Sequence, residues 1–281
     1  MVRLEGGPFY MGSESPAPFP ADGEGPVRRI TLSAFYISKF AVTSEQFAEF
    51  VRKAGYRTEA ERFGWSFVFR NHVPKLYQGP AQPGTPWWVQ VKAADWSHPE
   101  GPGSSVAGRA HHPAVHVSWN DAAAYCAWAG YRLPTEAEWE FAARGGLEQK
   151  LYPWGDELTP EGRHRCNIWQ GVFPDRDLGE DGFTNVAPVE AYEPNGFGLY
   201  NAVGNAWEWC ADYFDPSWHR EATRLDPVGP AGGNTRVMRG GSYLCHESYC
   251  WRYRVAARTG TPPDSSTGHI GFRVARDVHQ A

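Results

Sequence analysis

One stretch of the chain carries most of the information about fold and chemistry: Arg239-Gly-Gly-Ser-Tyr-Leu-Cys-His-Glu-Ser-Tyr-Cys-Trp-Arg-Tyr-Arg254. Its two cysteines, Cys245 and Cys250, are five positions apart. This spacing puts side chains on opposite faces of a strand and far apart around a helix, so the two sulfurs can meet only if the segment turns. The Gly-Gly pair upstream suits such a turn. The nearby arginines favour the thiolate, which is the nucleophilic and metal-binding form of cysteine.

Two thiolates without a third ligand close by suit a soft metal ion of low coordination number, above all Cu(I). A structural zinc site would need four ligands and usually a tighter Cys-x-x-Cys spacing. Cys245 and Cys250 could instead be two buried free thiols or an incidental disulfide. The spacing alone leaves these alternatives open.

The composition predicts a folded, loop-rich chain. Of 281 residues, 31 are glycine and 23 are proline, and there are 13 tryptophans, 13 tyrosines and 15 phenylalanines. So much glycine and proline indicates many turns and few long regular elements, while the aromatic rings supply much of the core. We expect a single domain over residues 1–281, of the α+β class with little regular secondary structure.

Charge and cysteine usage limit the classes of partner. The net charge of −5 argues against nucleic acid, because nucleic-acid-binding domains are usually basic. No apolar run approaches the roughly 18 residues of a membrane span, and the first residues lack the apolar stretch of a secretory signal. Five cysteines, an odd number, argue against a disulfide framework and for a reducing compartment. We therefore expect a cytoplasmic protein without nucleic-acid or membrane partners.

Three helices are predicted from capping boxes and glycine stops. The capping boxes are Thr43–Gln46, Ser118–Asp121 and Thr135–Glu138, and the stops are Gly55, Gly130 and Gly145-Gly146. Short strands are expected at 35–40, 236–239 and 271–275, and long connections at 13–26, 154–185 and 215–234. The second half of the chain should be nearly all loop and short strand.

Oxygen-bearing side chains in glycine-rich loops form a second candidate site. They lie in two segments, 167–183 and 195–208. Calcium takes about six to eight oxygen ligands, many of them backbone carbonyls of such loops. No EF-hand spacing is present, so solvated acidic loops are the simpler interpretation.

A third candidate consists of His111, His112 and His116. A proline follows His112 directly, and no cysteine or carboxylate at ligand spacing joins the histidines. We interpret this segment as turn and strand.

The chain resembles the formylglycine-generating enzymes, the sulfatase-modifying factor family. The resemblance runs nearly from end to end and rests on the stretch 239–254 together with FYISKFAVT (35–43), HVSWNDA (116–122), RLPTEAEWE (132–140), GNAWEW (204–209) and GFR (271–273). Most of these segments mark a broader fold family that also has non-catalytic members. The Cys245/Cys250 pair within Ser-Tyr-Leu-Cys-His-Glu-Ser-Tyr-Cys is specific to the aerobic enzyme.

The resemblance implies a compact, irregular fold akin to C-type lectins. It implies that O2 oxidises a cysteine in a Cys-x-Pro-x-Arg motif of an unfolded sulfatase to Cα-formylglycine. Cys245 and Cys250 would be the Cu(I) ligands, joined by the substrate thiolate as a third sulfur. Ser242 would be a catalytic polar group near the oxygen site, and Trp207 and Tyr249 would be walls of the substrate pocket. We expect a monomer.

The resemblance also implies two structural calcium ions that hold the loops. The first would bind the side chains of Asn167 and Asp181 and the carbonyls of Ile168 and Phe183. The second would bind the side chains of Asn201 and Glu208 and the backbone of Gly204 and Ala206.

The chain departs from the animal members of this family. Those carry structural disulfides, whereas Ala143, Val255 and Val274 hold the partner positions here and leave Cys126 unpaired. The N-terminal extension of the animal members is also absent. Both differences lead us to expect a prokaryotic, cytosolic enzyme.

Two other functional classes stay open. A non-catalytic binding module of the same fold would need no paired cysteines, so Cys245 and Cys250 argue against it. A sulfoxide synthase of the ergothioneine type would take part of its iron-binding histidines from a further domain, for which 281 residues leave no room.

Overall fold

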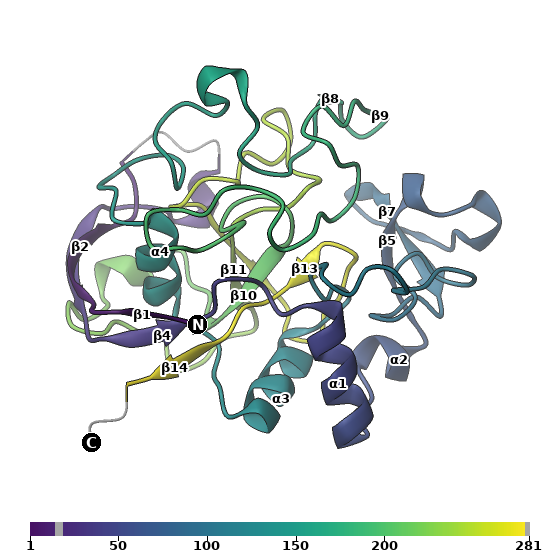
Figure 1. The fold of residues 1–281 in the computed structure, drawn as a ribbon, viewed down its shortest axis with the longest axis horizontal. Coiled ribbons are helices and arrows are strands. Elements are labelled where there is room, and N and C mark those ends of the chain that lie inside the picture. The colour runs from purple at the N-terminus through teal and green to yellow at the C-terminus, as the bar shows by residue number, and fades with distance from the viewer. Residues whose placement is uncertain (15–18, 279–281) are drawn as a thin grey trace.

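The computed structural model describes residues 1–14 and 19–278. Figure 1 shows short helices and strands embedded in long loops, as the glycine and proline content predicts. The α+β class with little regular secondary structure is confirmed. In the described part of the chain, no helix is both long and apolar enough to cross a bilayer.

The three predicted helices are confirmed. They are α1 (Ser44–Ala54), α3 (Trp119–Ala129) and α4 (Glu136–Arg144), and each begins at its capping box and ends at a glycine with left-handed backbone. A fourth helix, α2 (Glu59–Phe63), is missing from the prediction, although Thr58 and Glu61 form a capping box of the same kind. Its single turn and a half is too short to show an apolar period.

Fourteen short strands form five small sheets over the described residues. The central sheet has the order β12 (Arg258–Thr261), β11 (Arg236–Arg239), β10 (Trp207–Tyr213) and β13 (Ile270–Gly271). A second joins β1 (Val2–Leu4), β4 (Phe35–Ile37) and β14 (Ala275–Asp277), so that both ends of the chain meet in one sheet (Figure 1). The remaining strands are β2 (Gly7–Met11) with β3 (Arg28–Leu32), β5 (Trp65–Phe69) with β7 (Thr85–Lys92) and β6 (Ala81–Gln82), and β8 (Gly171–Val172) with β9 (Arg176–Asp177).

The strand predictions are partly correct. The strand at 236–239 is confirmed, and the one at 35–40 ends earlier, at Ile37. The continuous strand at 271–275 is wrong, because residues 272–274 lie between β13 and β14. There the chain leaves one sheet for another, and the buried Arg273 donates to the carbonyls of Ser38, Lys39 and Tyr200. The carbonyls of Phe272 and Val274 accept from the backbone N–H groups of Val42 and Ser38, but these bonds do not form a continuous strand.

The long connections at 154–185 and 215–234 are confirmed as largely irregular, with one two-stranded hairpin and short 3-10 turns. Within 13–26, the 3-10 turn η1 (Pro20–Asp22) is formed, and residues 15–18 lie outside the described residues.

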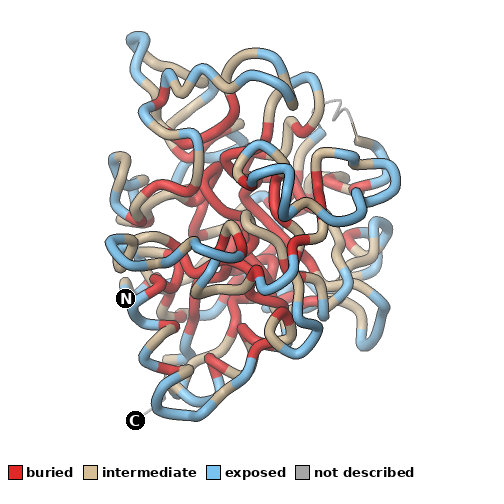
Figure 2. The backbone as a smooth tube through the Cα atoms, turned by 90° about the vertical axis from the view of Figure 1, so that its right-hand side faces the viewer, coloured by how far each residue is buried: buried red, intermediate tan, exposed pale blue. Residues whose placement is uncertain are grey.

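Aromatic rings fill the core, as predicted. Figure 2 shows buried backbone running through the middle of the molecule. The largest cluster is rich in rings and packs α1, α3 and α4 around the central sheet. It includes the fully buried Phe47, Phe50, Trp139, Trp209 and Phe272.

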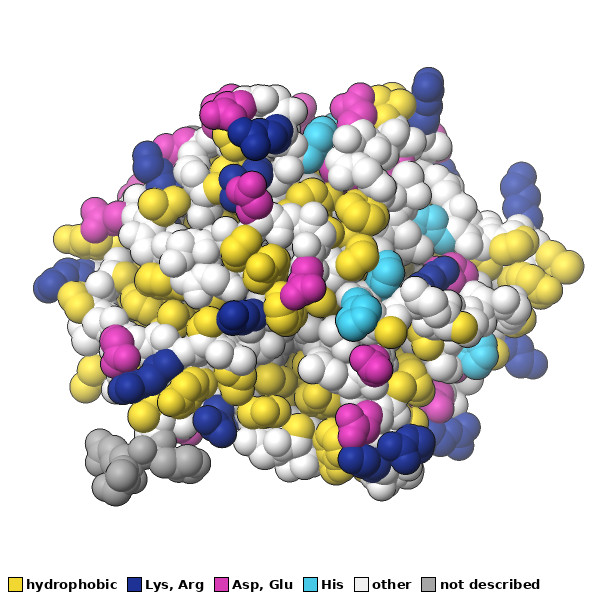
Figure 3. All heavy atoms as spheres, in the orientation of Figure 1, with side chains coloured by type: hydrophobic (Ala, Val, Ile, Leu, Met, Phe, Trp, Pro, Cys, Tyr) yellow, Lys and Arg dark blue, Asp and Glu magenta, His cyan; other side chains and the backbone are white. Residues whose placement is uncertain are grey.

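Buried arginines are the less expected part of the interior. The set consists of Arg239, Arg254, Arg258 and Arg273, each at most 1% exposed. Each pairs with a buried glutamate and also donates to backbone carbonyls of loops. Buried loop carbonyls need donors that no sheet provides, and the guanidinium groups supply them. On the face in Figure 3, the remaining Lys and Arg side chains lie scattered among Asp and Glu.

Candidate active site

Cys245 and Cys250 stand at the two ends of a turn that follows β11. Their Sγ atoms are 2.7 Å apart, both thiols are free, and the residues are 2% and 5% exposed. The Cys250 N–H donates to His246 O (2.7 Å), which closes the turn. The sequence prediction that this segment must turn to bring the sulfurs together is therefore confirmed.

Glycine is required just upstream of the turn. Gly241 has φ +72°, and a Cβ there would lie 3.0 Å from the backbone of Arg252 and Tyr253. The chain therefore passes tightly against its own return segment, and the two cysteines are held in a closed loop.

The two thiols are electrostatically unequal. Burial raises the pKa of Cys245 well above its usual range. Burial also opposes ionisation of Cys250, but the hydrogen bond from Cys245 and the guanidinium of Arg252 outweigh it and lower the pKa of Cys250. Cys250 is thus the sulfur of the pair that ionises more readily. A soft cation that bound both sulfurs would take the place of the shared proton.

Ser242 lies directly against this pair and is fully buried. Its N–H donates to Cys245 Sγ (3.4 Å), and its carbonyl accepts from the Cys245 N–H (2.9 Å). Its Oγ accepts from Leu244 N–H (3.3 Å) and lies 3.0 Å from His269 Nδ1. Ser242 therefore contacts a sulfur through its backbone and a histidine through its side chain.

Aromatic rings line the other side of the turn. The Tyr249 ring stacks on Phe173 (centroids 4.4 Å apart, 4° between planes) and meets the edge of Trp87 at 4.7 Å. Trp207 is 4% exposed and packs in the same core cluster as the two cysteines. Trp87, Phe173 and His269 were not among the predicted site residues, because they come from segments distant in sequence and belong to no local motif.

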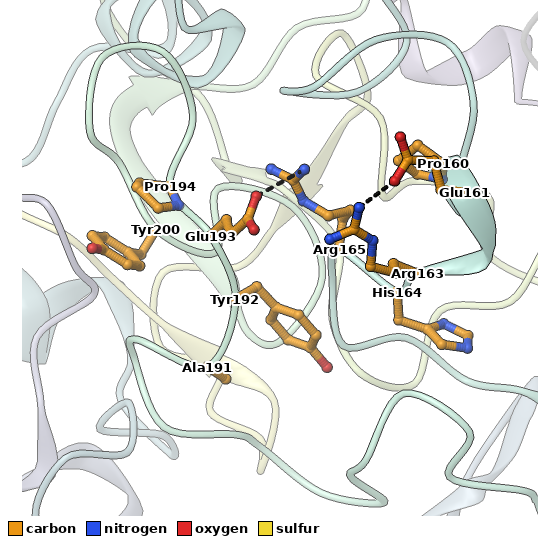
Figure 4. A pocket seen from close by; sticks show the side chains of 10 residues that line it. All are labelled: Pro160, Glu161, Arg163, His164, Arg165, Ala191, Tyr192, Glu193, Pro194 and Tyr200. Carbon is orange, nitrogen blue, oxygen red and sulfur yellow. Dashed lines mark hydrogen bonds and ion pairs between the residues drawn. The ribbon is translucent and has the colours of Figure 1, made fainter.

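A large hollow lies elsewhere on the molecule. It has a volume of about 670 Å³ and is lined by residues within 160–165, by residues 191–194 and by Tyr200 (Figure 4). Its charged groups pair among themselves, Arg163 with Glu161 and Arg165 with Glu193. Neither cysteine of the turn is among its lining residues, so this hollow is separate from the candidate site.

The residues predicted for the first calcium ion lie together. Asp181 accepts from the N–H groups of Ile168 (2.8 Å) and Phe183 (3.0 Å). Asn167 is 1% exposed, and its side-chain oxygen has no hydrogen-bond partner among the described residues. A buried amide oxygen without a donor fits a ligand of a hard cation. The amide nitrogen of Gln170 contacts both Ile168 O and Asp181 Oδ2.

The second predicted site has similar features and one difference. The Asn201 side-chain oxygen is also buried without a partner within the described chain, and Asn201, Ala206 and Glu208 line a cavity of about 10 Å³. The Glu208 carboxylate, however, already accepts from Arg273 (2.5 and 2.7 Å) and from the Trp139 indole (2.7 Å). Gly204 donates its N–H to Gly240 O (2.8 Å).

The three histidines do not form a metal cluster. His116 uses both ring nitrogens, toward Ser66 Oγ (2.8 Å) and Pro99 O (2.8 Å). Over residues 1–14 and 19–278, no group of three or more His, Cys, Asp or Glu side chains is placed to hold a metal. His111 lies in a turn and His112 in a bend, so the turn is confirmed, but the predicted strand is wrong, because only an isolated bridge between Pro113 and Thr43 forms here.

The absence of the animal-type disulfides is also confirmed within the described structure. Cys126 is a buried free thiol, and Ala143, Val255 and Val274 are buried core residues.

Known proteins are similar to this chain over nearly its whole length. A model of the sulfatase-modifying factor enzyme 1-like domain matches residues 1–278. The formylglycine-generating enzyme of Thermomonospora curvata is 62% identical, over 99% of this chain and 93% of that protein. The formylglycine-generating enzyme of Bos taurus is 52% identical, over 99% of this chain and 74% of that protein. A mouse relative, inactive C-alpha-formylglycine-generating enzyme 2, is 49% identical over 98% of this chain and 85% of its own length.

A solved structure supports the fold. PvdO from Pseudomonas aeruginosa aligns with a TM-score of 0.70 at 24% identity, over 99% of this chain and 94% of that chain. At this identity the likeness shows the fold alone, and it confirms the formylglycine-generating-enzyme fold, akin to C-type lectins. The matched domain model and the identities with full-length relatives show that the chain belongs to the formylglycine-generating enzyme, or sulfatase-modifying factor, family.

Proposed function

We propose that this protein oxidises the cysteine of a Cys-x-Pro-x-Arg motif in an unfolded sulfatase to Cα-formylglycine, with O2 and with Cu(I) bound by Cys245 and Cys250. The observation that carries the proposal is the pair of free sulfurs, 2.7 Å apart at the ends of one turn. A relative at 49% identity is named inactive, so membership of the family does not by itself establish catalysis. The cysteine pair is the feature that links this chain to the reaction.

The donor set fits the proposed metal. Two thiolates, without a histidine or carboxylate cluster in the described structure, suit soft Cu(I) rather than zinc or iron. When bound, Cu(I) supplies an open position for a client thiolate and the redox chemistry with O2. Ser242 holds Cys245 through its N–H, and the turn holds Cys250, so the chain fixes both sulfurs before a metal or a client arrives.

The electron balance of the reaction shows that an external reductant is required. Conversion of the thiol-bearing carbon to an aldehyde takes up one water and releases hydrogen sulfide, two protons and two electrons, and reduction of O2 to two waters takes four protons and four electrons. An external reductant, such as a small thiol, must provide the other two. Tyr249, Trp87 and Phe173 form an apolar wall beside Cys250 that can exclude water and pack against the proline of the client motif.

We also propose two structural calcium ions at the sites predicted from the sequence. The partnerless buried oxygens of Asn167 and Asn201 support this, one for each site. At the second site, Glu208 is neutralised by Arg273, so its carboxylate can contribute less charge than that of Asp181 at the first.

The test uses the purified protein loaded with Cu(I), a reducing thiol, air and a synthetic peptide with the Cys-x-Pro-x-Arg motif. Mass spectrometry should show conversion of cysteine to the aldehyde, dependent on copper and lost in Cys245→Ala and Cys250→Ala. Cys126→Ala is the matched control, because Cys126 is another buried free thiol outside the turn. Copper uptake without conversion, together with peptide binding, would favour a non-catalytic binding module instead.

A further inference from the structure

The side chain of Arg252 is fixed between a carboxylate and a sulfur. Its Nε donates to Asp22 Oδ2 (2.6 Å) and its Nη2 to Asp22 Oδ1 (3.2 Å). The remaining nitrogen, Nη1, faces Cys250 Sγ at 4.0 Å. Asp22 belongs to η1, near the start of the chain, so the two partners of the guanidinium come from opposite ends of the sequence.

This arrangement is partly sheltered from water. The side chains of Asp22 and Arg252 are 10% and 20% exposed. The ring of Phe19 covers the guanidinium, with Cζ 3.7 Å from the ring centroid. A free arginine side chain has many rotamers, and the two hydrogen bonds with the ring contact restrict it to the one that faces the sulfur.

A neighbouring ion pair, Arg254 with Glu24, allows the contact of Arg252 with a sulfur to be distinguished from a purely structural role in holding the segment. Arg254 donates to both oxygens of Glu24 (2.6 and 2.7 Å), so two parallel pairs tie residues 22–24 to residues 252–254. The third nitrogen of Arg254, Nε, donates to Trp251 O (2.8 Å) and not to a sulfur. Both pairs hold the segment, but only Arg252 reaches a metal-binding atom.

We propose that Asp22 and Arg252 are positioning residues that stabilise the Cu(I) form of the Cys245–Cys250 pair. This inference rests on the proposed function. Two thiolates and one Cu(I) carry a net charge of about −1, which is costly to bury unless a cation lies near it. Arg252 supplies that cation, and Asp22 keeps it from turning toward solvent. Partners of this kind, which orient or balance metal ligands without binding the metal, typically change metal affinity by about 10–100-fold.

The experiment measures Cu(I) affinity without oxygen, by competition of the full-length protein with a chromophoric Cu(I) chelator. Arg252→Gln should weaken binding by about 10–100-fold. Arg252→Lys should weaken binding less, because it keeps the charge but cannot make the two-pronged contact with Asp22. Asp22→Asn should also weaken binding, because the guanidinium loses its charged anchor.

Glu24→Gln and Arg254→Gln are the matched controls, since they loosen the same segment without touching a sulfur. They should leave Cu(I) affinity within about twofold of the wild type, even where thermal unfolding shows a loss of stability like that of Asp22→Asn. Equal affinity of wild type and Arg252→Gln would overturn the inference, as would tighter binding by Asp22→Asn. A wild-type protein that takes up no stoichiometric Cu(I) would instead overturn the copper part of the proposed function.

Discussion

The Oγ atom of Ser242 lies 3.0 Å from Nδ1 of His269, while the backbone N–H of the same serine donates to the Cys245 sulfur. Burial, with a smaller contribution from His116, lowers the pKa of His269 to about 3. The ring is therefore neutral above about pH 4 and can either donate one hydrogen bond to the serine or accept one from it. His269 thereby sets the direction of the Ser242 hydroxyl.

We expect His269→Leu to lower kcat for the peptide about tenfold, because the Ser242 hydroxyl would be free to rotate. His269→Asn keeps a polar group near Oγ and should restore part of that loss. Cu(I) affinity should be unchanged in both variants, since His269 does not contact a sulfur. Steady-state kinetics with chelator competition checks both statements, and a fully active His269→Leu would show that the contact is only structural.

Calcium removal should lower the thermal stability of the wild type. A ligand present at about 100 times its Kd stabilises the folded state by about 2.7 kcal/mol, which in a chain of this size corresponds to a shift in Tm of roughly 5–10 °C. Scanning calorimetry with and without a calcium chelator measures this shift.

Asn167→Ala and Asn201→Ala should each reduce the calcium-dependent part of that shift, because each removes a buried, partnerless oxygen. The exposed Asn71→Ala is the control and should keep the whole shift. Identical Tm values of the wild type in calcium and in chelator would refute both proposed sites.

Local signals in the sequence predicted some parts of this structure well. The capping boxes and glycine stops of α1, α3 and α4 depend on contacts within four residues, so the sequence reveals them directly. The spacing of Cys245 and Cys250 predicted a turn only on the condition that the two sulfurs meet, and the spacing alone did not establish that they do. β10 was not predicted, because Cys210 and Ala211 interrupt the alternation of apolar and polar residues that begins at Trp207 and that marks a half-buried strand.

Other features depend on partners that are distant in sequence. Glu136 and Glu140 lie on a short helix where acidic residues are normally exposed, yet they are 5% and 0% exposed. Their burial is possible because Arg239 and Arg258 arrive from the central sheet, in addition to Arg144 of the same helix, which pairs with Glu140. The aromatic wall and the pairing of Arg252 with Asp22 also depend on residues that are distant in sequence, so no local pattern predicts them.

The third prediction concerns the buried ion pairs of Arg239 with Glu136 and Glu140. Its guanidinium donates to Glu136 (2.9 Å), Glu140 (2.5 Å) and two backbone carbonyls, and all three side chains are at most 7% exposed. Burial disfavours the charged form of Glu136, but the surrounding arginines hold its pKa well below its usual range. Arg239→Leu leaves two buried carboxylates short of a partner, and we expect a loss of about 3–5 kcal/mol in the free energy of unfolding.

Urea denaturation of Arg239→Leu against the wild type measures this loss. Lys53→Ala is the comparison, because its ion pair with Glu49 is half-exposed on α1 and should be worth at most about 0.5 kcal/mol. A loss of under 1 kcal/mol in Arg239→Leu would mean that the glutamates are solvated or protonated once the arginine is gone.

The last prediction concerns acid stability and His116. Burial lowers the pKa of His116 from its ordinary 6.5 to about 4, and both ring nitrogens are already hydrogen-bonded inside the protein. Because the folded-state pKa lies below the unfolded value, the unfolded chain takes up the proton first. Stability is therefore lost as the pH falls from about 6.5 toward 4, by up to about 3 kcal/mol for this residue.

His116→Asn should remove this part of the pH dependence. Asparagine tolerates the left-handed backbone at this position (φ +58°), so the turn can persist. The variant should be less stable than the wild type at pH 7, where it has lost the two hydrogen bonds of the ring, and the difference should shrink as the pH falls to 4. Urea denaturation at several pH values gives both curves. The carboxylates titrate in both proteins, so the change in the difference reports His116 together with its smaller effect on the pKa of His269. Parallel curves would show that His116 is protonated without cost in the folded state.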